Sequence, residues 1–199
     1  MLDAIRITRY VPESAAETAG LIAMYEAYLR EELDRTHDFA DGYPAAAYLN
    51  TFLVHDGAAL IGFCSIDTVH RAIELIYITP EFRRRGIASN LVKMLKASCP
   101  APMRAKAPLS PLGQLLMDAT AVPATDPPPE DVRRGEEERR ILHRALSEAC
   151  QHRRGNPGRA CGRCQRACVA QMAKRMVLSY VLLKRLDQRV ATDQVREAA

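Results

Sequence analysis

The chain of 199 residues is long enough for one sizeable hydrophobic core, or for one domain of roughly 120 to 150 residues with an appendage. Because MLDAIRITRY lacks a basic start followed by an apolar core, and no run approaches about 18 uncharged apolar residues, the sequence indicates neither export nor a membrane span. We therefore expect a cytoplasmic protein without membrane contact. The formal net charge is +4, but residues 1–129 hold 12 Lys and Arg against 15 Asp and Glu, whereas residues 130–199 hold 16 against 9, so the positive excess belongs to the C-terminal third.

The first part of the chain predicts a strand, a long helix and a hairpin, in that order. The alternating stretch LDAIRITRYV is typical of a strand, and the segment that begins at Pro12 has apolar residues at helical spacing. The runs TFLVH and LIGFCSIDTV are expected to be strands joined by a turn at Asp56 and Gly57. The next run, IELIYI, is almost wholly apolar, which predicts a central strand.

A loop with three arginines follows the central strand and leads into helical sequence. GIASNLVKMLKAS predicts a helix whose apolar residues Ile87, Leu91 and Leu95 face a sheet. MRAKA is a weak strand candidate. SPLGQLLMDA predicts a short helix with Ser110 as its N-cap and Pro111 at its first position.

The proline-rich stretch AVPATDPPPED is expected to hold no regular structure and to act as a stiff linker. Beyond it, EDVRRGEEERRILHRALSEAC predicts a helix and HRRGNPGRA a loop. A second helix is predicted over roughly residues 165–190, with an apolar stripe at Val169, Met172, Met176, Tyr180 and Leu183. The chain is thus predicted to have a domain over residues 1–122, a linker over residues 123–131 and a helical module over residues 132–199.

The loop around Gly86 joins the predicted central strand to a helix. Such a junction gathers unpaired backbone N–H groups and the positive end of the helix dipole. Gly86 would let the backbone approach a phosphate closely, Ala88 keeps the first turn small, and the arginines add positive charge. The pattern predicts an anion site, and the alternative is an exposed basic turn without a ligand.

At this loop the sequence resembles the GCN5-related N-acetyltransferase family, whose acetyl-CoA loop reads R/Q-x-x-G-x-G/A. The matching residues are Arg83-Arg84-Arg85-Gly86-Ile87-Ala88, preceded by the strand IELIYIT and by Pro80-Glu81-Phe82. The resemblance covers roughly residues 3–122 and is best from about 52 to 98. It implies an α+β fold with a mixed, mostly antiparallel sheet flanked by helices, in which two central strands splay apart to admit the pantetheine arm of acetyl-CoA.

The resemblance also implies a set of groups that bind acetyl-CoA. Backbone groups of Ile76, Tyr77 and Ile78 would face the thioester arm. The pyrophosphate would lie on the loop and the start of the helix, which comprise Arg83, Arg84, Arg85, Gly86, Ile87, Ala88 and Ser89.

The implied activity is direct transfer of an acetyl group from acetyl-CoA to a primary amine. A base must then receive a proton from the amine, and Glu74 matches a position where many family members keep a carboxylate, with Asp67 and His70 in reserve. Family members often carry a tyrosine acid in the helix after the fifth strand, but SPLGQLLMDA has Met117 near that place. Tyr77 or a water could serve instead, and a degenerate domain that only binds acyl-CoA is the alternative.

Four cysteines lie within 19 residues of the C-terminal part, a clustering that favours a metal over disulfides in a reducing compartment. The pattern C-x-H-x8-C-x2-C predicts a zinc site made by Cys150, His152, Cys161 and Cys164. Cys168 is an alternative fourth ligand, and four thiolates would also suit an iron–sulfur cluster. Reduced or redox-active cysteines are the third reading.

Ten basic residues lie between positions 150 and 190, against one acidic residue. This excess suits nucleic acid, although the segment has little aromatic interleaving and a solvated helix face is the commoner explanation. The apolar stripe of the second helix would instead pack on the first domain or on a second copy of the chain in a homodimer. The sequence does not identify the acceptor amine.

Overall fold

The computed structural model describes residues 5–37, 49–99, 101–150, 152 and 161–178. In chain order its elements are β1 (Ile5–Arg9), α1 (Ala15–Thr36), β2 (Leu49–Asp56), β3 (Ala59–Asp67), β4 (Ala72–Ile78), the 3-10 turn η2 (Pro80–Phe82), α2 (Ile87–Ser98), β5 (Arg104–Lys106), α3 (Pro111–Thr120), β6 (Ala124–Thr125) and α4 (Pro129–Ala149). Residues 162–178 are also helical, and we call them the C-terminal helix.

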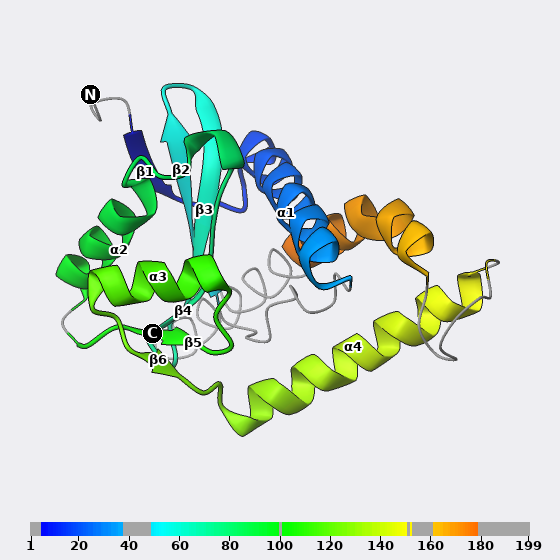
Figure 1. Cartoon of the computed structure of the whole chain (residues 1–199). Coiled ribbons are helices and arrows are strands. Elements are labelled where there is room, and N and C mark those ends of the chain that lie inside the picture. Colours follow the sequence, from blue (N-terminus) through cyan, green and yellow to red (C-terminus); the bar gives the residue numbers. More distant parts are fainter. Residues whose placement is uncertain (1–4, 38–48, 100, 151, 153–160, 179–199) are drawn as a thin grey trace, which may run out of the picture.

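The strands form one sheet in the order β1-β2-β3-β4-β5-β6 (Figure 1). The first four strands are antiparallel neighbours, whereas β5 and β6 run parallel to β4. The predicted mixed, mostly antiparallel sheet flanked by helices is confirmed. The predicted central strand lies between β3 and β5, which explains its nearly uniform apolar sequence.

Local signals in the sequence place the turns and helix starts where the structure has them. The hairpin between β2 and β3 turns at Gly57, whose positive φ of 59° favours glycine. Ser14 and Ser110 cap α1 and α3, because their side chains accept hydrogen bonds from the backbone N–H groups of Glu17 and Gly113. The predicted cap of the short helix is therefore confirmed.

Helices cover both faces of the sheet and make two separate hydrophobic clusters (Figure 1). On one face, α2 and α3 contribute residues that include Ile87, Leu91 and Met117. On the other face, α1 contributes Tyr25 and Leu29, both fully buried. The predicted orientation of the apolar face of α2 toward the sheet is confirmed.

The C-terminal helix lies beside α1 and belongs to the same cluster (Figure 1). Val169, Met172 and Met176 from the predicted apolar stripe are buried there, with exposed fractions of 0%, 7% and 2%. The described part of this stripe therefore packs in the same cluster as α1. The other two stripe residues, Tyr180 and Leu183, lie outside the described residues.

The proline-rich stretch differs from the prediction that it holds no regular structure. Ala124 and Thr125 form β6, which pairs in parallel with Ala105 and Lys106 of β5. The prediction failed because two residues are too few to show strand periodicity. The helix after the prolines is confirmed as α4, and it begins inside the predicted linker at Pro129, the first helical position that proline favours.

Among the described helices, none is both long enough and apolar enough to cross a lipid bilayer.

Candidate functional site

Strands β4 and β5 are paired only where β4 begins. Ala72 pairs with Arg104 and Ile73 with Ala105, and no later pair of these two strands is registered among the described residues. On its other side β4 stays paired with β3 as far as Ile78. From Glu74 onward, β4 therefore has a strand partner on one side and parts from its neighbour on the other, which is the splay that the family resemblance implies.

A β-bulge lies at the point where the two strands part. Ser65 of β3 faces Leu75 while Ile66 faces Ile73, so Glu74 is the extra residue on β4. The bulge reverses the alternation of side chains, because Ile73 packs in the cluster of α2 and α3 whereas Leu75 packs against that of α1. Bulges often re-aim a side chain beside a functional site. Here the re-aimed side chain is that of the predicted base.

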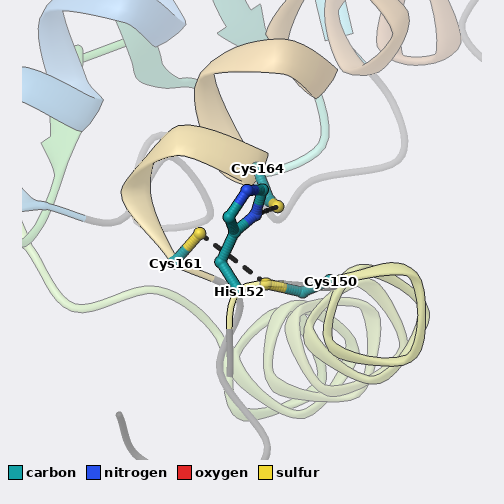
Figure 2. A group of neighbouring side chains, drawn as sticks. All are labelled: Cys150, His152, Cys161 and Cys164. Carbon is teal, nitrogen blue, oxygen red and sulfur yellow. Dashed lines mark hydrogen bonds between the residues drawn. The ribbon is translucent and has the colours of Figure 1, made fainter. Parts of the chain in front are cut away.

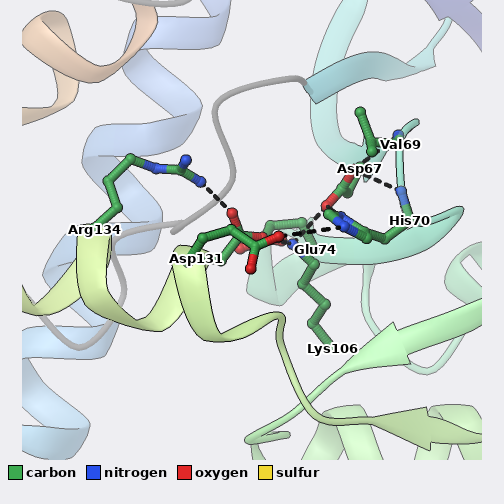
Figure 3. A network of polar contacts seen from close by, with 8 residues as sticks. Asp67, Val69, His70, Glu74, Lys106, Asp131 and Arg134 are labelled. Carbon is green, nitrogen blue, oxygen red and sulfur yellow. Dashed lines mark hydrogen bonds and ion pairs between the residues drawn. The ribbon is translucent and has the colours of Figure 1, made fainter.

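The carboxylate of Glu74 lies in a buried polar cluster around Lys106, the last residue of β5 (Figure 3). The Lys106 Nζ is 3.0 Å from Glu74 Oε2 and 2.6 Å from carboxylate oxygens of both Asp67 and Asp131. All four side chains are at most 8% exposed. Asp131 comes from the first turn of α4 and also pairs with Arg134. Three carboxylates from β3, β4 and α4 thus share one ammonium.

Asp67 and Lys106 stabilise each other's charged form. Burial alone would raise the pKa of Asp67, but hydrogen bonds from Lys106 and His70 lower it below the ordinary value. Burial would likewise lower the pKa of Lys106, but hydrogen bonds to Asp131 and Asp67 raise it. The Nδ1 of His70 lies 2.7 Å from Asp67 Oδ2, and this ring is only 37% exposed. Asp67 therefore shares Lys106 with the predicted base, and His70 lies beside Asp67.

Asp67, His70 and Asp131 bring ligand atoms close enough to hold a metal ion. A metal ion would be attracted to the two carboxylates, but the ammonium of Lys106 already lies between them, at 2.6 Å from each. We therefore assign the group as an ion-pair cluster around Lys106 and not as a metal site.

The start of α2 has the features of an anion-binding helix start. Its N-cap is Gly86, whose φ of 74° is positive and which offers no side-chain cap, and no acidic residue lies in the first turn. In α1 and α3 a serine side chain accepts a hydrogen bond from an N–H group of the first turn. In α2 no side chain caps the first turn in this way. A helix start of this kind binds anions through its N–H groups and its dipole.

The three arginines of the loop have different surroundings. The guanidinium of Arg83 donates two hydrogen bonds to Glu31 of α1, at 2.7 and 2.6 Å, and a third to the carbonyl of Ile78 at 2.7 Å. Arg85 donates to the Glu81 carbonyl. Arg84 is exposed and has a positive φ of 60°. The structure thus engages Arg83 with α1 and leaves Arg84 and Arg85 at the surface.

Tyr28 of α1 lies near enough to the predicted base for Glu74 to affect its pKa, whereas Met117 of α3 is buried at 3% exposure in the cluster on the opposite face. The rings of Tyr28 and Tyr77 meet edge to face at 5.8 Å. Burial is the main cause that raises the pKa of both phenols, so both stay protonated at neutral pH. For Tyr28, Glu32 and Glu74 add to this effect.

The predicted Cys/His residues come together between α4 and the C-terminal helix (Figure 2). Ligand atoms of Cys150, His152, Cys161 and Cys164 all lie within 4.8 Å of one another. Cys150 Sγ is 3.6 Å from Cys161 Sγ, and Cys164 Sγ is 3.5 Å from His152 Nδ1. The alternative ligand Cys168 is not part of this group.

The pKa values of Cys150 and Cys164 are shifted in opposite directions. Backbone hydrogen bonds involving Cys161 and then His152 lower the pKa of Cys150 to about 6. Hydrogen bonding to Cys150 and to Cys161 raises the pKa of Cys164 to about 12. These surroundings therefore favour the thiolate of Cys150 and the protonated thiol of Cys164.

Residues 15–106 match the model of the Acetyltransferase (GNAT) family. The chain therefore contains a GNAT acetyltransferase domain, and the predicted enzyme class, an acetyl-CoA-dependent N-acetyltransferase, is confirmed. The match spans α1 to β5 and ends before α3, β6, α4 and the C-terminal helix. No curated protein matches this chain.

Three solved structures are similar to part of the chain. The first is that of AAC(6')-Iy in complex with the bisubstrate analogue CoA-S-monomethyl-acetylneamine, at 21% identity and a TM-score of 0.40, with 62% of this chain and 94% of that chain covered. The second is an aminoglycoside acetyltransferase from an uncultured soil metagenomic sample, at 16% identity and a TM-score of 0.40, with 59% and 88% covered. The third is a predicted acetyltransferase with acetyl-CoA from Clostridium acetobutylicum, at 14% identity and a TM-score of 0.42, with 61% and 92% covered. Similarity at this level does not bear on the activity of the present chain.

Sequence reasoning missed Lys106, Asp131 and Glu31. In the sequence Lys106 belongs only to a weak strand candidate, and its partner Asp131 lies 25 residues further along the chain. The one local signal was the pair of acidic residues at the start of α4, but acids in a first helical turn are common because they suit the helix dipole.

We expect the loss of the Lys106 ammonium to destabilise the folded protein strongly. Replacing Lys106 by Met should lower the free energy of unfolding by about 3–5 kcal/mol at pH 7, because three buried carboxylates lose their shared counterion. Urea unfolding followed by circular dichroism measures this change. Lys93→Met, on the exposed side of α2, is the matched control and should shift stability by less than about 0.5 kcal/mol. Equal effects of the two variants would show that the cluster does not hold the structure together.

Proposed function

We propose that this chain transfers the acetyl group of acetyl-CoA directly to a primary amine, without an acetyl-enzyme intermediate. The observation that carries the proposal is the parting of β4 from β5 after Ile73, which brings the bulged Glu74 to the vertex and leads along β4 to the uncapped start of α2. A linear cosubstrate with a reactive end and an anionic middle matches this order. The thioester would lie near Glu74 and the pyrophosphate at α2.

The binding of acetyl-CoA divides between backbone and side chains. Backbone groups of Ile76, Tyr77 and Ile78 would hold the pantetheine arm in place of the strand pairing that β4 lacks on this side. The N–H groups of the first turn of α2, from Gly86 to Ser89, would bind the pyrophosphate, and Arg84 and Arg85 would add charge. Arg83 takes a different role in this proposal. Its bidentate pair with Glu31 ties the loop to α1.

In the transfer, the lone pair of the amine attacks the thioester carbon, a C–N bond forms and the C–S bond breaks, and CoA leaves as a thiolate. Glu74 accepts the proton that the amine nitrogen loses, either directly or through a water. Its carboxylate is suited to this role because it is 8% exposed and because Lys106 contacts it at a longer distance than Asp67 or Asp131. The thiolate takes its proton from Tyr77 or from water.

The proposal includes Zn²⁺ as a structural ion that takes no part in the reaction. Three cysteines and one histidine are a donor set that zinc favours. These residues lie at the end of α4 and the start of the C-terminal helix, whereas the transfer is assigned to β4, β5 and α2. No step of the transfer passes through the metal.

Removing the base tests the catalytic part of the proposal. Glu74→Gln should lower kcat with a primary amine by about 10²- to 10⁴-fold, because the amine then lacks its proton acceptor. The dissociation constant for acetyl-CoA should stay within about twofold, as calorimetric titration would show. Glu81→Gln, in the exposed turn η2, is the matched control and should retain activity. Full turnover of Glu74→Gln would exclude Glu74 as the base.

Removing the loop charges tests the binding part. The double variant Arg84→Ala/Arg85→Ala should bind acetyl-CoA at least about tenfold more weakly, because each charge-assisted hydrogen bond to a phosphate contributes about 1.5–3 kcal/mol. Titration calorimetry measures the affinity, with Lys93→Ala on α2 as a control for net charge. The loss should shrink as ionic strength rises. Unchanged affinity of the double variant would remove both arginines from the site.

A further inference from the structure

The Cys/His cluster lies at the edge of the hydrophobic core rather than on a separate appendage. Cys150 is 6% exposed and belongs to the same cluster of buried residues as Tyr25 and Leu29 of α1. Cys161 and Cys164 are partly buried against this cluster. The residues that could hold a metal are therefore continuous with the contact between α1 and the C-terminal helix.

Apolar packing is the main interaction that holds the described part of the C-terminal helix on α1. It buries Val169, Met172, Met176 and Val177 in the cluster that includes α1, and most of the stability of a helix in a protein comes from such packing. The exposed pair of Arg166 and Asp34, each side chain 65% exposed, adds little. A metal that joins Cys150 to Cys161 would lower the conformational entropy of the unfolded chain and so stabilise the folded one.

Two separations between ligand atoms of the cluster agree with those of one tetrahedral zinc site. With Zn–S bonds of about 2.3 Å and a Zn–N bond of about 2.0–2.1 Å, two ligand sulfurs should lie about 3.8 Å apart, and a sulfur and a nitrogen about 3.6 Å apart. The observed separations are 3.6 Å between Cys150 and Cys161 and 3.5 Å between Cys164 and His152 Nδ1. The sulfurs are too far apart for a disulfide, whose S–S bond is about 2.05 Å. Ligand atoms within 4.8 Å of one another suit one ion better than a cluster of several iron atoms.

We propose that one Zn²⁺, bound by Cys150, His152, Cys161 and Cys164, docks the C-terminal helix on α1, so that metal binding and helix docking are a single event. Cys168 is not a ligand in this assignment. The metal clamps the end of α4 to the first turn of the C-terminal helix and so completes the hydrophobic cluster over α1. The inference rests on the structural zinc of the proposed function and is independent of acetyl transfer.

The test combines metal content with hydrogen exchange on the full-length chain. The purified protein should contain about one zinc per chain, and Cys161→Ser should lower this content at least tenfold. Cys168→Ser and Cys99→Ser are the matched controls and should keep the metal, since neither residue belongs to the cluster. Chelation of the wild-type protein should speed exchange at least tenfold in peptides from residues 21–33 and 162–178, and added zinc should restore the slow rate. Peptides from β2 to β4 should not change.

Three outcomes would overturn the inference. The first is a folded wild-type protein without zinc, and the second is a loss of metal in Cys168→Ser as large as that in Cys161→Ser. The third is chelation that leaves exchange in α1 unchanged or that speeds it equally throughout the sheet. Cobalt substitution gives an independent check, because the absorption bands of a tetrahedral site should be unchanged in Cys168→Ser and should shift in His152→Ala, where water replaces one ligand. Acetyl-CoA titration of the same samples shows separately whether the proposed transferase function stands.

Discussion

The candidate site depends on one constraint, which is that among the described residues β4 is paired with β5 only at Ala72 and Ile73. Beyond these residues the parallel strands part, and the backbone of β4 is left with a strand partner on one side only. Buried peptide groups that lack a strand partner cost free energy unless another group pairs with them. The Ile78 carbonyl is paired with Arg83, and we propose that an extended polar ligand pairs with others on this side of the strand. The strand ends at Ile78, and the chain then turns through the loop whose helix start lacks a side-chain cap. Both features lie along one path, which is why we assign them to one cosubstrate.

The point where the strands part brings a second requirement, which is a positive partner for a buried carboxylate, because the bulge at Glu74 directs its side chain into a buried region. Lys106 satisfies it from the last position of β5, and Asp67 and Asp131 complete the cluster. Such a buried ionic group contributes little net stability compared with apolar packing, although removing one member is costly. A charged cluster at this position therefore suggests a use in chemistry. It also joins α4, outside the segment that matches the family model, to the strands inside it.

The sequence predicted the parts of the fold that depend on neighbouring residues. Ser110 and Pro111 located α3, the turn at Gly57 located the hairpin, and the C-x-x-C spacing located the Cys/His cluster, because each signal lies within a few residues. Contacts between distant segments were not predictable in the same way. The pairing of Arg83 with Glu31 spans 52 positions, and no local pattern distinguishes an arginine that pairs with a helix from one that faces solvent. The bulge and the two-residue strand β6 were missed because neither leaves a periodic pattern.

Hydrogen exchange in the presence of saturating acetyl-CoA tests the central claim most directly, which is that the parted edge of β4 and the start of α2 form one cosubstrate site. The account predicts slower exchange at the amides of residues 74–78 and 84–90, with little change in α3 and in β1. Protection of α2 without protection of β4 would contradict the account, because the cosubstrate would then bind at the loop without entering between the strands.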